Sequence, residues 1–389
     1  MSEQNPNRSF YQDRYFNMQV LGGLSALIML GLSIYLTKHY FNVIYPSGKL
    51  GGSALCDINA FFNCDVATTS LASNIFGVPI SLIGVLLGIF ILLGFFFKSE
   101  GLERTIHSLL YINAAGCIIL FIYSLVGLGG LCPACTLYYI FSLITLFVFR
   151  KTSDLKGVHL PSFFTFGLVY IAVFGITKAN LPKTQNDASD VPQSVKEGLI
   201  KQFKELKKMG TPDFDSEFIM SSSSVKFKEA PVQITKFSDF ECPACKMLSE
   251  VLHNISNKYK EKVAIQYFFY PLDNNCNPEM TRPMHKLACK AAYIAACKPE
   301  KFSLLEQEFF SNQEKLTEEW LNNIAKRENI EECSKDLKTK EKVISYIKAA
   351  KPFNVKSTPT FLLNGVKIEG VLPQSQLEVL INYILKQKK

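Results

Sequence analysis

Apolar and polar positions are unevenly distributed along this chain of 389 residues. In roughly its first half, long uncharged apolar segments alternate with short polar loops, whereas the second half mixes apolar and charged residues at short intervals. A helix needs about 20 apolar residues to cross a bilayer. Five segments approach or exceed this length, at 15–37, within 76–97, near 105–126, near 132–149 and at about 160–177. The pattern predicts a transmembrane bundle followed by a soluble part.

The third and fourth segments come from one run, 105–149, that contains no Asp, Glu, Lys or Arg. The run is too long for a single span, and the glycine-rich "GLGG" at 127–130 is the natural place for the chain to fold back. A cleavable signal peptide is the alternative for the segment 15–37. Its apolar core is too long and no small-residue cleavage site follows directly, so we expect an uncleaved helix.

Charge supports the division and predicts the orientation. The first 180 residues contain 10 Lys and Arg against 7 Asp and Glu, and the remainder 32 against 27. A net charge of +8 spread so thinly does not predict nucleic-acid binding. Arg8, Arg14, Lys98, Arg104, Arg150, Lys151 and Lys156 fall on one side of the predicted spans, and Lys38, Lys49 and Lys178 on the other. The positive-inside rule then predicts a cytoplasmic N-terminus, with loop 42–75 and everything after 180 outside.

The second half has the pattern of an α/β domain. Its predicted elements are a linker at 181–193, a helix near 194–209, a strand at 231–240, mostly helices over 280–350, a hairpin at 358–370 with "NG" as its turn, and a helix at 374–387.

The spacing of the 11 cysteines indicates redox chemistry. The tetrapeptide CPAC occurs at 132–135 in an apolar region and again at 242–245 in a polar one. Zinc also binds C-x-x-C, but a structural zinc site needs four ligands and these two motifs belong to different parts of the chain. We therefore expect dithiols and no metal, in an oxidising compartment. Lone Cys117 is expected to be an ordinary small apolar residue.

The soluble motif follows a predicted strand and begins a predicted helix. At such a helix N-terminus, unpaired N–H groups and the helix dipole stabilise a thiolate on Cys242, and Pro243 suits the first helical position. Cys245 lies on the same face and can resolve a mixed disulfide.

These features, together with "STPTFLLNG", resemble the DsbA-like branch of the thioredoxin superfamily over residues 225–389. The resemblance implies a cis bond between Thr358 and Pro359 that packs against the cysteine pair. That family usually has a buried, proton-relaying acid six residues before the first cysteine, where this chain has Lys236. Glu241 is adjacent to the pair, but we expect its side chain to point outward.

Four further cysteines lie in or near the predicted helical region, Cys276, Cys289, Cys297 and Cys333. We expect two structural disulfides, with three possible connectivities. Cys289 and Cys297 lie about 12 Å apart along one predicted helix, which excludes a bond between these two while the helix is intact. Buried free thiols are the alternative.

The membrane motif opens the fourth span, with two more cysteines in the loop before the second span. Cys56 and Cys64 are eight residues apart, Ser70 follows six residues later, and "NIFG" precedes the span. Together with Cys132, Cys135 and Tyr139, this spacing resembles the vitamin K epoxide reductase (VKOR) family over about 15–150.

This second resemblance implies an electron relay. Cys132–Cys135 would lie next to a quinone, ubiquinone or menaquinone, with Cys135 nearest the ring, and Cys56–Cys64 would shuttle electrons to it. Ser73, Asn74 or Tyr139 would hydrogen-bond the quinone carbonyls. An interfacial aromatic belt is the alternative role for Tyr139.

The predicted fold is a multidomain membrane protein. A VKOR-like transmembrane domain (1–155) and a fifth, linking helix (156–180) form a five-helix bundle with a four-helix core. A linker and helical lead-in (181–224) then precede a DsbA-like α/β thioredoxin-fold domain with a helical insertion (225–389).

The predicted function is disulfide formation in exported proteins at the bacterial inner membrane, with the thioredoxin-like domain on the periplasmic side. Exported protein thiols, a membrane quinone and the lipid bilayer are the expected partners. The alternatives are an isomerase or reductase that uses the same dithiols, and reduction of a quinone or vitamin K epoxide as the main output. A membrane-anchored chaperone or adhesin with only structural disulfides is the non-enzymatic alternative.

Overall fold

The computed structural model divides the chain into two compact units. One comprises residues 1–44 and 70–183, and the other 45–69 and 184–389. The structure describes residues 9–12, 16–45, 50, 61–128, 130–155, 157–181, 188–220, 225–281 and 283–387. Cys56 and four of the basic residues used to predict the orientation, Arg8, Arg14, Lys49 and Lys156, lie outside these described residues.

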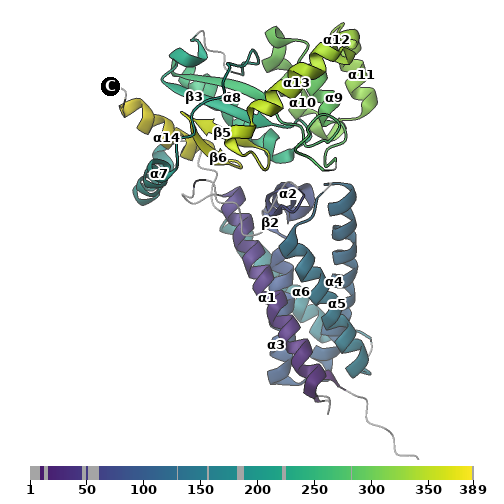
Figure 1. Cartoon of the computed structure of the whole chain (residues 1–389). Helices are drawn as coiled ribbons and strands as arrows, with labels where there is room; N and C mark the ends of the chain where they lie inside the picture. The colour runs from purple at the N-terminus through teal and green to yellow at the C-terminus, as the bar shows by residue number, and fades with distance from the viewer. Residues whose placement is uncertain are drawn as a thin grey trace, which may run out of the picture. The chain divides into compact units, whose positions relative to one another are not determined.

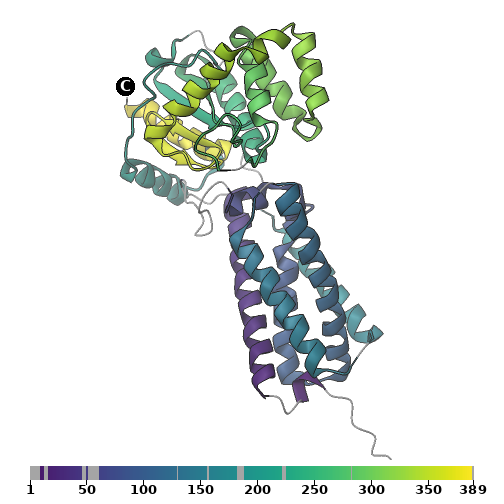
Figure 2. The ribbon, with the colours of Figure 1, turned by 45° about the vertical axis from the view of Figure 1, so that its right-hand side comes forward.

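The first unit is a bundle of helices that run side by side (Figures 1 and 2). Its helices are α1 (Phe16–Ile44), α3 (Ser81–Phe97), α4 (Glu100–Val126), α5 (Pro133–Thr152) and α6 (Leu160–Ala179). Helix α1 packs against α3 and α5, and α4 packs against α5 and α6. Each predicted apolar segment therefore forms a helix.

Four of these helices, α1, α4, α5 and α6, are long and apolar enough to cross a membrane. Helix α3 is apolar but has 17 residues, which is about 25 Å of helix. Large apolar side chains such as Ile119, Leu168 and Phe96 face outward, while Ser142 and Thr145 are buried. This inversion of the usual soluble pattern is typical of a membrane domain, because lipid solvates such an apolar outer surface favourably.

Among the described residues between α1 and α3 are a short helix and a two-stranded hairpin. Helix α2 (Cys64–Thr69) belongs to the second unit. Strands β1 (Asn74–Ile75) and β2 (Val78–Pro79) form a small antiparallel hairpin in the first unit.

The second unit contains a four-stranded sheet in the order β4-β3-β5-β6. Strand β3 (Val232–Ser238) is parallel to β4 (Val263–Phe269) and antiparallel to β5 (Thr360–Leu363), which pairs with β6 (Val366–Glu369). Every residue of β4 is buried, as expected for a strand covered on both faces. The tight β5–β6 turn has Asn364 and Gly365 at positive φ, which confirms the predicted "NG" hairpin.

Helices surround this sheet. Helix α7 (Gln193–Glu205) packs against the closing helix α14 (Gln374–Gln387), which contacts α8 (Pro243–Tyr259). Between β4 and β5 the chain forms α9 (Ala288–Ala295), α10 (Phe302–Ser311), α11 (Glu318–Arg327), α12 (Glu331–Lys335) and α13 (Leu337–Ala349). An apolar core, in which the aromatic residues Phe237, Tyr267 and Phe302 are fully buried, joins the sheet to these helices.

Candidate active site

The soluble cysteine pair lies at the junction of β3 and α8. Cys242 is the N-cap of α8 and Pro243 takes the first helical position, where its missing N–H group has no intrahelical partner to lose. Both Cys242 and Cys245 are free thiols and are almost completely buried. The Cys242 thiol lies 3.3 Å from the carbonyl oxygen of Thr358, and the Thr358–Pro359 bond is cis. The structure thus brings both cysteines and the Thr-Pro turn together.

The two thiols differ in their electrostatic surroundings. Burial raises the pKa of Cys242, and the neighbouring Cys245 adds to this rise. Burial also acts to raise the pKa of Cys245, but the hydrogen bond with Cys242 and the positive charge of Lys236 outweigh it and lower that pKa. The sequence predicts a thiolate on Cys242 from the helix N-terminus. In the folded domain the buried Lys236 favours a thiolate on Cys245 instead.

Lys236 is paired with an acid that the sequence does not predict. Its ammonium group donates to Glu306 of α10 at 3.0 Å, and both side chains have no exposed surface. Ser249 donates to the same carboxylate at 2.6 Å, and His253 lies 2.8 Å from its other oxygen. Burial acts to raise the Glu306 pKa, but Lys236 and His253 outweigh this effect and lower it.

A sequence signal for Glu306 does exist. The residue occupies the apolar face of α10, between Phe302 and Phe309, where an acid is out of pattern. An ionised side chain on a core-facing position requires a partner. Its partner is 70 positions away in the sequence, which is why spacing does not identify it.

The expectation that Glu241 points outward is wrong. Its side chain is half-buried, and its carboxylate accepts a hydrogen bond from the backbone N–H of Leu287 at 2.7 Å. Burial and the nearby Asp239 raise the Glu241 pKa to about 7. The side chain turns inward because the chain after β4 returns to this corner and presents an unpaired backbone donor there.

The membrane cysteine pair also caps a helix. Cys132 is the N-cap of α5, and it forms a disulfide with Cys135 across a Cα–Cα distance of 5.2 Å. Tyr139 follows Cys135 by one helical turn and is therefore on the same face of α5. Its ring is partly buried and contacts Phe121, with 6.4 Å between ring centroids.

The predicted loop pair is described only in part. Cys64 begins α2, is buried and is disulfide-bonded, and Cys56 lies outside the described residues. Helix α2 packs against α8, the helix that begins at the soluble CPAC motif.

The side chains of Ser73 and Asn74 form hydrogen bonds within the β1–β2 hairpin. The Asn74 side-chain oxygen accepts the Gly77 N–H at 2.9 Å, and its amide donates to the Ser73 hydroxyl at 3.1 Å. These bonds hold the hairpin β1–β2, in which Phe76 and Gly77 have positive φ. Of the three residues predicted to contact a quinone, Tyr139 is the one on the same helix as Cys135.

Quinones are aromatic and lipid-soluble, so a suitable site combines apolar walls with a few hydrogen-bonding groups. The first two turns of α5 meet this requirement, because the phenolic hydroxyl of Tyr139 is one turn from Cys135 in an apolar helix. These residues fit a quinone ring, whereas the Asn74 amide already has partners.

The remaining four predicted site cysteines form two disulfides, Cys276–Cys289 and Cys297–Cys333. Cys289 and Cys297 do not pair with each other. The structure thereby selects one of the connectivities that spacing leaves open, because the loop after β4 folds back onto α9.

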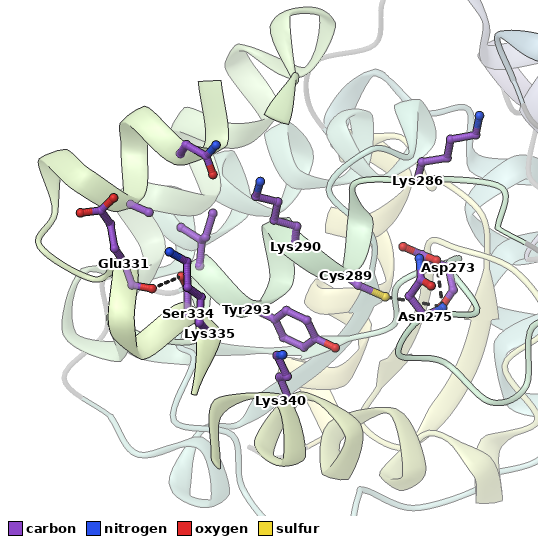
Figure 3. Close-up of a pocket in the computed structure, with 13 residues that line it drawn as sticks. Asp273, Asn275, Lys286, Cys289, Lys290, Tyr293, Glu331, Ser334, Lys335 and Lys340 are labelled. Carbon is purple, nitrogen blue, oxygen red and sulfur yellow. Dashed lines mark hydrogen bonds between the residues drawn. The ribbon is translucent and has the colours of Figure 1, made fainter. Parts of the chain in front are cut away.

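The helical region contains a cavity of about 320 Å³ that includes neither CPAC motif. Lys286, Lys290, Lys335 and Lys340 surround it, and the Tyr293 ring lies among them (Figure 3). Among the predicted site residues, Cys289 lines the cavity, through its structural disulfide position. The cavity is therefore separate from the two CPAC pairs.

Comparisons with known proteins match each part of the chain. Residues 20–149 match the model of the vitamin K epoxide reductase family, and residues 227–383 match a thioredoxin model. Proteins named "Probable disulfide bond formation protein D" from Bacillus cereus and Bacillus anthracis are each 29% identical over 150 residues, which cover 35% of this chain and 67% of theirs.

Solved structures with similarity include the catalytic domain of Proteus mirabilis ScsC, at 16% identity over 49% of this chain and 98% of that one, with a TM-score of 0.36. Wolbachia pipientis alpha-DsbA1 is similar at 18% identity over 44% of this chain and 91% of that one, also with a TM-score of 0.36.

The apolar bundle, the thioredoxin-like sheet and the cysteine pairs at two helix N-termini define a membrane thiol-disulfide oxidoreductase. Residues 20–149 are similar to the vitamin K epoxide reductase family, and residues 227–383 are similar to thioredoxins.

Proposed function

We propose that this protein is a quinone-dependent oxidase that introduces disulfides into exported proteins. Electrons pass from Cys242–Cys245 to Cys56–Cys64, then to Cys132–Cys135 and finally to a membrane quinone. The observation that supports this proposal is that the same cysteine motif begins a helix in both units. A CPAC pair caps α5 in the apolar bundle, and another caps α8 in the soluble unit. An aqueous protein thiol and a lipid-dissolved oxidant require two separate sites of this kind.

The first step is disulfide exchange on the oxidised soluble pair. A substrate thiolate attacks the Cys242 sulfur, the Cys242–Cys245 bond breaks, and Cys245 leaves as a thiolate. A second substrate thiolate then attacks the mixed disulfide, forms the substrate disulfide and releases Cys242. The pair retains two electrons and takes up two protons. A leaving thiol of low pKa departs faster, so the lowered Cys245 pKa supports oxidation in this direction.

The reduced soluble pair is next oxidised by the loop disulfide. The Cys242 thiolate attacks one sulfur of Cys56–Cys64, and Cys245 resolves the resulting mixed disulfide, which leaves two thiols on the loop. Packing of α2, which begins at Cys64, against α8 supports this transfer. The loop dithiol reduces Cys132–Cys135 by the same two exchanges.

Cys135 and Tyr139 would hold the quinone ring at α5, with Ser73 and Asn74 at the hairpin as secondary contacts. When bound, the quinone supplies a two-electron acceptor for the reduced Cys132–Cys135 pair. The Tyr139 hydroxyl would orient the ring by donating a hydrogen bond to a carbonyl oxygen. Apolar residues of the bundle, including Tyr138 and Phe141 of α5, would contribute the walls of this site.

The proposed topology has five spans, with α3 as the short second one. Its N-terminus is cytoplasmic, and the hairpin, α2 and the second unit are extracytoplasmic, in agreement with the distribution of basic residues. The proposed domains are 1–155, 156–180, 181–224 and 225–389. Cys276–Cys289 and Cys297–Cys333 have a structural role in the last of them.

The experiment that tests this function traps thiols with a heavy maleimide in membranes and reads the redox state of Cys242–Cys245. We expect an oxidised pair in the wild type with quinone, and a reduced pair without quinone or in Cys132→Ala. A pair that stays reduced in every condition would refute the oxidase and favour the reductase or isomerase. A pair that stays oxidised in Cys132→Ala would show that the membrane motif is not its oxidant.

A further inference from the structure

The turn that leads into Cys242 is built on one side chain, Asp239. Its carbonyl oxygen accepts the Cys242 N–H at 3.2 Å, and its carboxylate accepts the Glu241 N–H at 2.7 Å. Asp239 is almost completely buried. The position of the Cys242 backbone therefore depends on where this carboxylate is held.

The same carboxylate binds the loop that follows β4. Its second oxygen accepts the Leu272 N–H at 2.7 Å and the His285 ring N–H at 2.8 Å. Burial acts to lower the His285 pKa, but the charge and hydrogen bond of Asp239 raise it to about 9, so the ring is positively charged at neutral pH. Glu241 adds a second connection through Leu287 at 2.7 Å. The carboxylates of Asp239 and Glu241 thus accept four hydrogen bonds. Three of them join the Cys242 turn to residues 272–287, and the fourth orders the turn itself.

The loop between Leu272 and His285 is closed at its base. The N–H groups of Met284 and His285 both donate to the Leu272 carbonyl, at 2.9 and 3.2 Å. The Cys276–Cys289 disulfide spans the same loop, and Cys289 is four residues after His285. Figure 3 shows Cys289 beside Asp273 and Asn275 of this loop. The disulfide therefore limits how far His285 can move from Asp239.

On its other side the turn contacts the side chain of Gln313. Gln313 donates to the carbonyl oxygens of Phe240 and Cys242 at 2.7 and 3.0 Å. Without the loop, these bonds would be the main side-chain support of the turn. Cys242 would then be free to move relative to the Thr358 carbonyl.

We propose that Asp239 and His285 are positioning residues for the Cys242–Cys245 pair, and that the Cys276–Cys289 disulfide holds the loop that brings them together. This inference rests on the proposed thiol-disulfide exchange at that pair. Both side chains act through the backbone turn that carries Cys242. They act by keeping Cys242 buried, which disfavours its thiolate and stabilises the oxidised pair.

The two structural disulfides provide a matched comparison. Full-length protein in nanodiscs is equilibrated in glutathione buffers, alkylated, and digested with trypsin. The peptide Phe237–Lys246 contains Cys242 and Cys245 and no other cysteine. We expect Cys276→Ser/Cys289→Ser and Asp239→Asn to shift this pair about tenfold towards the dithiol, which is about 30 mV. Cys297→Ser/Cys333→Ser, equally missing a disulfide, should stay within about twofold of the wild type.

A variant at His285 separates positioning from a general loss of stability. His285→Gln retains an N–H donor for Asp239 and should keep the wild-type equilibrium, whereas His285→Leu should shift it like Asp239→Asn. The proposal is overturned if both disulfide variants shift equally, or if Asp239→Asn and Cys276→Ser/Cys289→Ser leave the equilibrium unchanged. If the wild-type pair itself does not exchange with glutathione, the proposed function fails rather than the positioning role.

Discussion

The ammonium group of Lys236 lies 3.0 Å from the Glu306 carboxylate, and neither side chain reaches solvent. Strand β3 and helix α10 thereby meet through two opposite charges, and the positive charge acts on Cys245. Transfer of either charge out of water is costly, so each residue depends on the other for its ionised state. The ammonium group also lies 4.6 Å from the centre of the Phe310 ring.

Removing one member of this ion pair should destabilise the soluble domain strongly. We expect Glu306→Gln to lower the free energy of unfolding by about 3–5 kcal/mol, because Lys236 would remain buried without a counter-charge. Lys236→Met/Glu306→Met should recover most of that loss. Trp320 is the single tryptophan and lies in α11, so its fluorescence during urea denaturation reports this domain.

The control for this comparison is the exposed Lys301, which pairs with the partly buried Glu328 at 3.3 Å. Lys301→Met should change the free energy of unfolding by less than about 1 kcal/mol. A loss in Glu306→Gln no larger than that of Lys301→Met would contradict the importance of the buried pair.

The charge of Lys236 should also set the rate of disulfide exchange. In Lys236→Met/Glu306→Met the Cys245 thiol loses its nearby cation, so its pKa rises and it leaves more slowly. We expect reduction of the Cys242–Cys245 disulfide by glutathione at pH 7 to slow by about threefold to tenfold. Mass spectrometry of the alkylated cysteine peptide gives this rate. A rate equal to that of the wild type would show that Lys236 does not act on Cys245.

Removing the resolving thiol should trap the transfer between the soluble pair and the loop. In Cys245→Ala, Cys242 can attack the loop disulfide but the mixed disulfide cannot be resolved from within the soluble pair. We expect a cross-linked peptide between Cys242 and Cys56 or Cys64 in non-reducing digests. The variant Cys242→Ala serves as the control and should give no such peptide. Absence of the cross-link in Cys245→Ala would refute direct transfer to the loop.

The Tyr139 hydroxyl should matter for the quinone and not for thiol exchange. A hydrogen bond contributes about 1–1.5 kcal/mol, so its loss in Tyr139→Phe should raise the quinone KM about fivefold to tenfold. The neighbouring Tyr138 donates to Asn113 at 3.0 Å, so Tyr138→Phe is a matched change that should leave this KM unaltered. Quinone reduction with a dithiol substrate provides the measurement. Equal KM values for the wild type, Tyr139→Phe and Tyr138→Phe would show that Tyr139 does not bind the quinone.

The Asp239–His285 pair should make stability depend on pH. The His285 pKa is raised from about 6.5 to about 9, so its stabilising effect is complete below pH 6.5 and disappears as the pH rises through 9. Linkage predicts that as much as about 3 kcal/mol is lost over this range. Urea denaturation followed by Trp320 at both ends of the range should show the loss in the wild type. If His285→Gln shows the same loss, another group is responsible.

Several features of this protein can be predicted from the sequence alone, because each depends on residues that are neighbours in the chain. The apolar segments, the two CPAC motifs at helix N-termini and the Thr358–Pro359 turn are each encoded by a few neighbouring residues. The strand before Cys242 and the "NG" hairpin have the same local origin. Such patterns identify the two domains and the cysteines that are candidates for exchange.

Only the tertiary structure determines the features that depend on contacts between residues far apart in the chain. The pairing of Cys276 with Cys289, the burial of Glu306 beside Lys236 and the inward turn of Glu241 all result from helices and loops that return to the sheet after β4. The same return brings Glu306 to Lys236, the cation on β3 that lowers the Cys245 pKa and so changes which thiol ionises more readily. Burial and charge pairing are set by the surroundings of a side chain, and in this protein those surroundings come from segments tens of residues apart.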